Sequence, residues 1–273
     1  MLTQPVPEHR RASHPLSLRQ EYGEFIEQRI EDFKNQLSRG ELLAIADDAV
    51  RELDAGPEGQ LLLTEVLVLE HVDRLIMRRL KLPTFRRWRQ RHIRLRRAQR
   101  APTHWGVPTD GPLVDLAPLL EPADHVLVIG SGAAPYAFFL AAHDTSVLVI
   151  DETLQGIEAV ETRATTEALG HRVQAMVVTL GRWFPDVTPT VVVFDAGRLT
   201  DLDPALRVPL IETAKARTAQ GGWHLIPPVE RRVDIHALAP EALQSSYRGW
   251  VLPVVSGDRL GRWFQARKPT VNP

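Results

Sequence analysis

The feature that most constrains this chain is a regular alternation of apolar runs and helical stretches after Pro102. Runs rich in Val and Ile, at 126–129, 146–150, 173–178, 191–194 and 223–226, are typical of strands buried on both faces. Helical stretches at 135–143, 154–169 and 204–219 lie between them. The alternation predicts an α/β domain with a doubly wound, mostly parallel sheet. Residues 250–255 and 262–266 flank a turn and predict a C-terminal antiparallel strand pair.

The residues before Pro102 follow a helical period instead. Tyr22, Phe25, Ile30 and Phe33 recur at helix spacing, and further helices are predicted over 41–53, 61–80 and 83–100. The first 16 residues are polar and contain prolines, which predicts disorder. We therefore divide the chain into a disordered N-terminus (1–16), a helical domain (17–101) and an α/β domain (102–273).

Composition excludes several classes of chemistry. The chain has no cysteine, so disulfides, thiolate metal sites and cysteine nucleophiles are ruled out. The N-terminus has no apolar core of the length that a secretory signal needs, and the longest uncharged run, 125–143, is broken by two glycines and a proline. We expect a cytoplasmic chain with no membrane partner. The acids and the histidine at 70–73 point to different faces of a helix, so no metal site is predicted.

The sharpest motif is a glycine loop between the first apolar run and the following helix. Gly130 and Gly132 would let a ligand approach the backbone, and the helix start presents free N–H groups to an anion. Asp151 ends the next strand, about twenty residues on, where a carboxylate can bind ribose hydroxyls. The dinucleotide fingerprint needs a small residue where Pro135 stands, whereas a G-x-G-x-G/A loop fits Gly130, Gly132 and Ala134.

With Asp195 after the fourth apolar run and the terminal strand pair, residues 103–268 resemble class I S-adenosylmethionine-dependent methyltransferases. The segments 103–108 and 239–269 resemble the small-molecule branch, which includes the tellurite-resistance and thiopurine enzymes. The resemblance implies S-adenosylmethionine as cofactor and a small-molecule acceptor. It also implies a set of cofactor-binding residues: Gly130, Ser131, Gly132, Ala134, Asp151, Glu152, Thr179, Leu180 and Asp195.

Methyl transfer is an in-line displacement that needs a base only when the acceptor is protonated. The candidates for that catalytic role are Asp195, His104 and Tyr247, with His224 as a further side chain of suitable type.

Two departures from the family pattern keep a second interpretation open. Val128 stands where the family usually has an acid before the first glycine, and Thr179 stands where an acid often binds the adenine amino group. Both losses favour a degenerate, non-catalytic cofactor-binding or interaction module.

The charges of the helical domain are strongly segregated. Residues 17–73 hold 14 acids and 5 bases, whereas residues 74–100 hold 12 bases and no acid. The basic helix, 83–100, makes RNA (tRNA or rRNA) an alternative acceptor. The interpretation favoured by sequence is that Arg89, Arg96 and Arg97 pair with the preceding acidic helices. A homodimer through the N-terminal helices is a further expectation.

Overall fold

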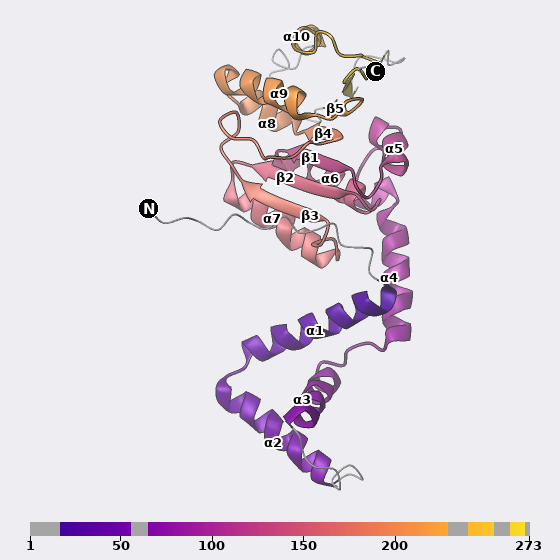
Figure 1. Cartoon of the computed structure of the whole chain (residues 1–273), viewed down its shortest axis with the longest axis vertical. Helices are drawn as coiled ribbons and strands as arrows, with labels where there is room; N and C mark the ends of the chain where they lie inside the picture. Colours follow the sequence, from indigo (N-terminus) through magenta and orange to yellow (C-terminus); the bar gives the residue numbers. More distant parts are fainter. Residues whose placement is uncertain (1–16, 56–64, 229–239, 254–262, 271–273) are drawn as a thin grey trace. The chain divides into compact units, whose positions relative to one another are not determined.

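A computed structural model describes residues 17–55, 65–228, 240–253 and 263–270 (Figure 1). The chain divides into two compact units, Met1–Leu95 and Arg96–Pro273. The division falls inside a helix, a few residues before the boundary at 101 that the sequence suggested. The expected disorder of 1–16 lies outside the described residues.

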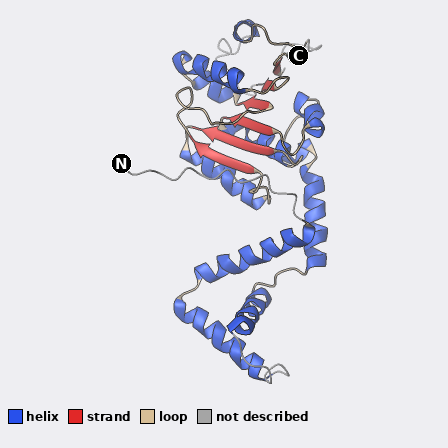
Figure 2. Ribbon diagram, viewed as in Figure 1, coloured by secondary structure: helices blue, strands red, loops and turns tan. Residues whose placement is uncertain are grey.

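The N-terminal unit is helical, as expected (Figure 2). It contains α1 (Leu18–Gln36), α2 (Arg39–Ala55), α3 (Glu65–Arg79) and the first part of α4 (Phe85–Gln99). A capping box between Ser17 and Gln20 fixes the start of α1. The apolar faces of α1, α2 and α3 bury one small core, made of Ile30, Ile45, Ala49, Val72, Leu75 and Ile76.

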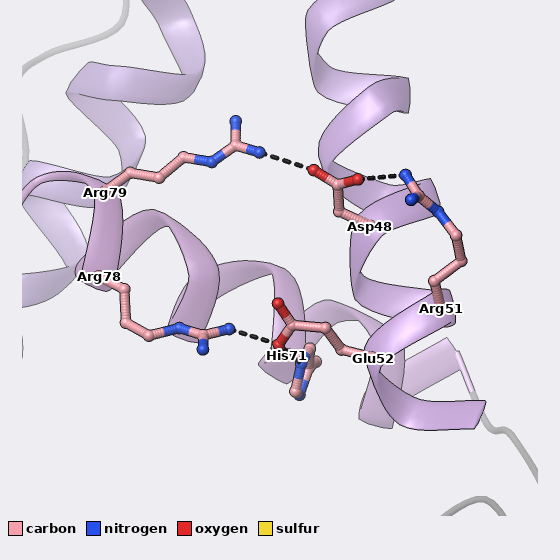
Figure 3. A network of polar contacts seen from close by, with 6 residues as sticks. All are labelled: Asp48, Arg51, Glu52, His71, Arg78 and Arg79. Atoms are coloured by element: carbon pink, nitrogen blue, oxygen red, sulfur yellow. Dashed lines mark hydrogen bonds and ion pairs between the residues drawn. The ribbon is translucent and has the colours of Figure 1, made fainter. Parts of the chain in front are cut away.

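Ion pairs between α2 and α3 correct the charge pairing that we expected from the sequence (Figure 3). Arg78 donates to Glu52 at 2.5 Å and Arg79 donates to Asp48 at 2.8 Å. Among the described residues, no ion pair joins Arg89 or Arg97 to any acid. Acids of α2 are therefore partnered by the end of α3, not by these arginines of α4.

The C-terminal unit is built on one six-stranded sheet in the order β3-β2-β1-β4-β5-β6. The strands are β1 (His125–Ile129), β2 (Ser146–Asp151), β3 (Val173–Val177), β4 (Val191–Phe194), β5 (Trp223–Ile226) and β6 (Phe264–Arg267). Strands β1 to β5 are parallel, and β6 pairs with β5 in the antiparallel sense. This arrangement confirms the predicted fold class, a mostly parallel doubly wound sheet with an antiparallel C-terminal strand.

Helices cover both faces of this sheet (Figure 1). Alternate residues of each strand point to opposite faces. Val126 and Val128 of β1 pack with α6 (Ala134–Ala141) and α7 (Leu154–Thr166) in one core. Leu127 and Ile129 pack in the other core with three helices: α8 (Ala196–Asp201), α9 (Pro204–Arg217) and α10 (Pro240–Ser246).

The sequence missed the shortest elements. These are α8, α10, α5 (Pro112–Leu116) and three 3-10 turns, η2 (Pro102–Trp105), η3 (Ala117–Leu119) and η4 (Ser131–Ala133). Each has fewer than eight residues, too few for a helical period to stand out. Of the strand expected over 250–255, the described residues 250–253 form one antiparallel bridge, between Val251 and Arg267, and 254–262 lies outside the described residues. Within the described ranges, no helix is long and apolar enough to span a membrane.

Candidate functional site

The candidate site lies where β1 ends between β2 and β4. Strand β2 lies on one side of β1 and β4 lies on the other. The connections from β1 to β3 run toward one edge of the sheet and the later ones toward the opposite edge, so the strand order reverses beside β1. In open α/β sheets, ligands bind at the carboxyl ends of the strands at such a switch point. The glycine loop, η4 and the start of α6 occupy this position.

Gly130 and Gly132 pack directly against the side chain of Asp195. Gly130 has a φ of 99°, which side-chain-bearing residues rarely adopt. A Cβ added there would lie 2.4 Å from the Cβ of Asp195, and a Cβ on Gly132 would lie 2.3 Å from Asp195 Oδ2. In this structure, the glycines therefore make room for a carboxylate of the chain itself.

Asp195 joins the glycine loop to α8. Its Oδ1 accepts a hydrogen bond from Gly197 N at 2.9 Å, which caps the helix, and its Oδ2 accepts one from Gly132 N at 3.1 Å. The N–H group of Gly132 thus already donates to a carboxylate oxygen, so the backbone of the loop suits an anion.

Asp151 is fully buried at the end of β2, and its carboxylate accepts four hydrogen bonds from the chain itself. Oδ2 accepts from Ser131 N at 2.5 Å. Oδ1 accepts from Thr153 N at 3.0 Å, from Thr153 Oγ1 at 3.2 Å and from Arg198 Nη2 at 3.0 Å. Each carboxylate oxygen has two lone pairs, so the three donors occupy Oδ1 fully, whereas Oδ2 accepts one hydrogen bond from the described residues.

These partners also set the charge state of Asp151. Burial raises the pKa of the carboxyl group, but hydrogen bonds from Ser131 and Thr153 and the positive charge of Arg198 outweigh it. The net pKa lies below its ordinary value, so Asp151 is a carboxylate at neutral pH.

A pocket of about 620 Å³ opens beside Asp151, at the carboxyl ends of β2 and β3. Met176, Val177 and Trp183 have 41%, 48% and 43% of their surface exposed, so the pocket offers apolar area to a ligand. The residues that line it are Glu152, Met176, Val177, Val178, Thr179 and Trp183.

The other predicted catalytic side chains lie elsewhere. His104 Nε2 lies 3.3 Å from the carboxylate of Glu167, which follows α7 and precedes β3, at the amino-end edge of the sheet. His224 sits in the first half of β5 and is fully buried with Tyr247, whose hydroxyl lies 2.7 Å from His224 Nδ1. Of these side chains, only Asp195 lies at the glycine loop.

Three further positions that the sequence analysis named have buried side chains. Ala134 is buried in the core beside β1, and Leu180 is fully buried in the core on the opposite face. Val128 has none of its surface exposed and packs among the apolar residues on the α6 side.

Sequence reasoning missed two residues of the site. Arg198, on the first turn of α8, contacts Asp151 from 47 residues away, and no pattern in the sequence links them. Gly156 lies under the loop, where an added Cβ would be 2.4 Å from Ser131 Oγ. The only sequence signal for Gly156 is its position in the first turn of α7, shortly after Asp151, and this signal is weak.

By sequence, no family model and no curated protein matches the chain. By structure, it is similar to solved methyltransferases. The glycopeptide N-methyltransferase MtfA complexed with S-adenosylmethionine shares 15% identity, with 54% of this chain and 82% of that chain covered and a TM-score of 0.44. TehB from Haemophilus influenzae shares 17% identity over 57% and 61% of the two chains, with a TM-score of 0.43. The N-methyltransferase NodS from Bradyrhizobium japonicum WM9 shares 16% identity over 66% and 96%, with a TM-score of 0.44.

Proposed function

We propose that the C-terminal unit binds S-adenosylmethionine and catalyses methyl transfer. The observation that carries this proposal is the placement of the glycine loop between Asp151 and Asp195 at the switch point of the sheet. An antiparallel last strand beside β5 accords with the same interpretation.

The residues at this edge fit the parts of that cofactor. The pocket beside Glu152 and Thr179 has the apolar surface that a purine ring needs. Asp151, at the end of β2, stands where it could bind ribose hydroxyls, and Gly132 N already binds a carboxylate. When bound, the cofactor supplies an activated methyl group, while the chain binds it and orients the acceptor.

Binding requires two contacts of the structure to change. Oδ1 of Asp151 must release a donor before it can accept from a ribose hydroxyl, and Arg198 is the one side-chain cation among the described partners of this carboxylate. The oxygen of Asp195 must also leave Gly132 N if a carboxylate of the cofactor is to bind there.

Asp195 is the residue we assign to the acceptor end of the site, because it reaches the loop from β4 and is partly exposed. A small-molecule acceptor is supported by the sequence resemblance alone. Exposed arginines of α4 that make no ion pair with the described residues, such as Arg87 and Arg94, favour a nucleic-acid acceptor instead.

A non-catalytic function is the second candidate, and two observations favour it. Asp151 is buried and accepts four hydrogen bonds from the chain itself, and Val128 replaces an acid with a buried apolar side chain. In that case the C-terminal unit would keep the fold and would catalyse no methyl transfer.

Calorimetric titration of the full chain with S-adenosylmethionine and with S-adenosylhomocysteine separates these candidates. We expect both to bind, and the Trp183→Leu variant to bind more weakly because Trp183 lines the pocket. Val208→Ala, a substitution of an exposed residue of α9, is the control. Absence of binding by either compound would support the non-catalytic candidate, and binding of NADH instead would support a dinucleotide enzyme.

A further inference from the structure

The arginine-rich part of α4 presents an unusual concentration of positive charge. Its sequence, FRRWRQRHIRLRRAQ, contains no acid. Within the N-terminal unit it contributes five arginines, Arg86, Arg87, Arg89, Arg91 and Arg94, and all five side chains are exposed.

The opposite face of this helix is anchored on α1. Trp88 is buried and lies 5.5 Å from the ring of Tyr22 and 6.2 Å from that of Phe25, measured between centroids. His92 stacks on Trp88 at 4.5 Å, and its Nε2 lies 2.9 Å from Glu21 Oε2. Trp88 and His92 face α1, whereas the five arginines occupy other positions around the helix and are exposed to solvent.

These exposed arginines differ from the arginines of α3, which have acidic partners. Arg78 and Arg79, at the end of α3, are paired with Glu52 and Asp48 (Figure 3). Among the residues that the structure describes, none of the five α4 arginines that belong to the N-terminal unit makes an ion pair. Two acids of α2, Asp48 and Glu52, are engaged by α3 instead.

The positions of these arginines give the charge a regular spacing. Arg87, Arg91 and Arg94 follow each other at steps of four and three residues, so they form one row along the helix. Neighbours in such a row have Cβ atoms about 5–6 Å apart. A repeating row of cations matches a polymer with regularly repeated anions, of which the phosphodiester backbone is the densest.

The chemistry of the face favours nucleic acid over a membrane or an acidic protein. Ile93, 49% exposed, is the only large apolar side chain among the exposed residues of α4, so the helix has little to insert into lipid. The cations of α4 are all arginines, whose planar guanidinium groups bind phosphate oxygens in pairs.

We propose that the face of α4 formed by Arg86, Arg87, Arg91 and Arg94 binds the phosphate backbone of nucleic acid. This surface lies in the N-terminal unit and is made of residues that take no part in the glycine-loop site. It therefore does not depend on methyl transfer. If both proposals hold, the nucleic acid is the acceptor or the carrier of the acceptor.

The test compares two double variants of the full chain that remove the same charge. Arg87→Gln/Arg94→Gln removes two unpaired arginines of α4, and Arg78→Gln/Arg79→Gln removes two paired arginines of α3. Binding of fluorescein-labelled RNA hairpin, single-stranded RNA and duplex DNA is measured by fluorescence anisotropy. The salt concentration is varied from about 50 to 200 mM, a range over which affinity that depends on phosphate contacts falls steeply. Circular dichroism checks that each variant is folded.

We expect the parent chain to bind nucleic acid with a steep salt dependence. The α4 variant should flatten the logarithmic slope by about 1.4 on single strands and about 1.8 on duplex DNA, for two lost phosphate contacts. The α3 variant should keep the parent slope. No binding at low salt, an equal change of slope in both variants, or tighter binding to phosphatidylserine vesicles or poly-glutamate than to nucleic acid would overturn the proposal. Loss of nucleic-acid binding with intact cofactor binding would leave the proposed methyl transfer standing.

Discussion

Arg198 Nη2 lies 3.0 Å from Asp151 Oδ1, and this ion pair occupies the carboxylate that a ribose would need. Asp151 is buried, whereas Arg198 keeps 26% of its side-chain surface exposed. The cation can therefore move into solvent at lower cost than the carboxylate can. We infer that Arg198 competes with the cofactor for Asp151.

Removing this competitor should change binding and stability in opposite directions. We expect Arg198→Gln to tighten S-adenosylmethionine binding by roughly fivefold, or about 1 kcal/mol, because one acceptor position of Asp151 becomes available. The melting temperature should fall, since a buried carboxylate loses a partner. Calorimetry and thermal unfolding measure the two effects. Weaker binding in a folded variant would mean that Arg198 contacts the cofactor itself.

The packing of Asp195 against the loop predicts a strict size limit at Gly132. An alanine Cβ there would lie 2.3 Å from Asp195 Oδ2, so the carboxylate must move and the loop must shift. We expect Gly132→Ala to weaken S-adenosylmethionine binding at least roughly tenfold, about the loss of one charge-assisted hydrogen bond. Gly40→Ala in α2 is the control, because nothing lies within 4 Å of its added Cβ. Equal affinity of the Gly132 variant and the parent would show that the ligand does not use the loop.

The two positions where the family pattern has acids respond differently, because one is exposed and the other buried. Thr179 is exposed on the pocket, so an acid there would remain solvated. We expect Thr179→Asp to tighten binding of S-adenosylmethionine by about 1 kcal/mol through a hydrogen bond to the adenine amino group. Thr188→Asp, at another exposed threonine of the same unit, should leave the affinity unchanged. Equal effects of both substitutions on affinity would place the adenine elsewhere.

An acid at position 128, by contrast, should destabilise the fold. Its side chain is fully buried among apolar residues, so a carboxyl group there would lack partners. We expect Val128→Asp to lower the free energy of unfolding by about 3 kcal/mol or more, with a much smaller loss for Val128→Thr. Denaturant unfolding measures both. A stable Val128→Asp variant with tighter cofactor binding would instead show that this position opens onto the site.

The fold was predictable because its signals are local. Runs such as 126–129 and 191–194 are uniformly apolar, and Gly130 and Asp151 mark the ends of neighbouring strands, so β1, β2 and their loop could be placed from the sequence. The contacts of the site were not predictable. Arg198 reaches Asp151, and Asp195 fills the loop, only through tertiary packing. Likewise, the charge runs predicted pairing with the arginines of α4, but nothing in them indicated that α3 would take Asp48 and Glu52.

Three buried side chains form a polar chain in the second half of the C-terminal unit. Thr218 Oγ1 donates to Ala214 O at 2.6 Å, so its oxygen is free to accept from His224 Nε2, 2.7 Å away. His224 Nδ1 then accepts from the hydroxyl of Tyr247, also 2.7 Å away. Because burial lowers the pKa of His224 to about 3, the imidazole is neutral at neutral pH, and this pattern assigns its proton to Nε2.

This arrangement predicts a specific loss of stability in acid. Burial, followed by the charges of Lys215 and Lys268, lowers the pKa of His224 from 6.5 to about 3. Between these two values the unfolded chain binds a proton that the folded chain does not. The contribution to stability is therefore complete above pH 6.5 and falls with decreasing pH by up to about 1.4 kcal/mol per unit. The free energy of unfolding, measured in denaturant between pH 7 and about 5, where most carboxylates remain charged, should show this slope in the parent and a flatter one in His224→Gln. Equal slopes in the two proteins would mean that water reaches His224 and that its folded-state pKa is not depressed.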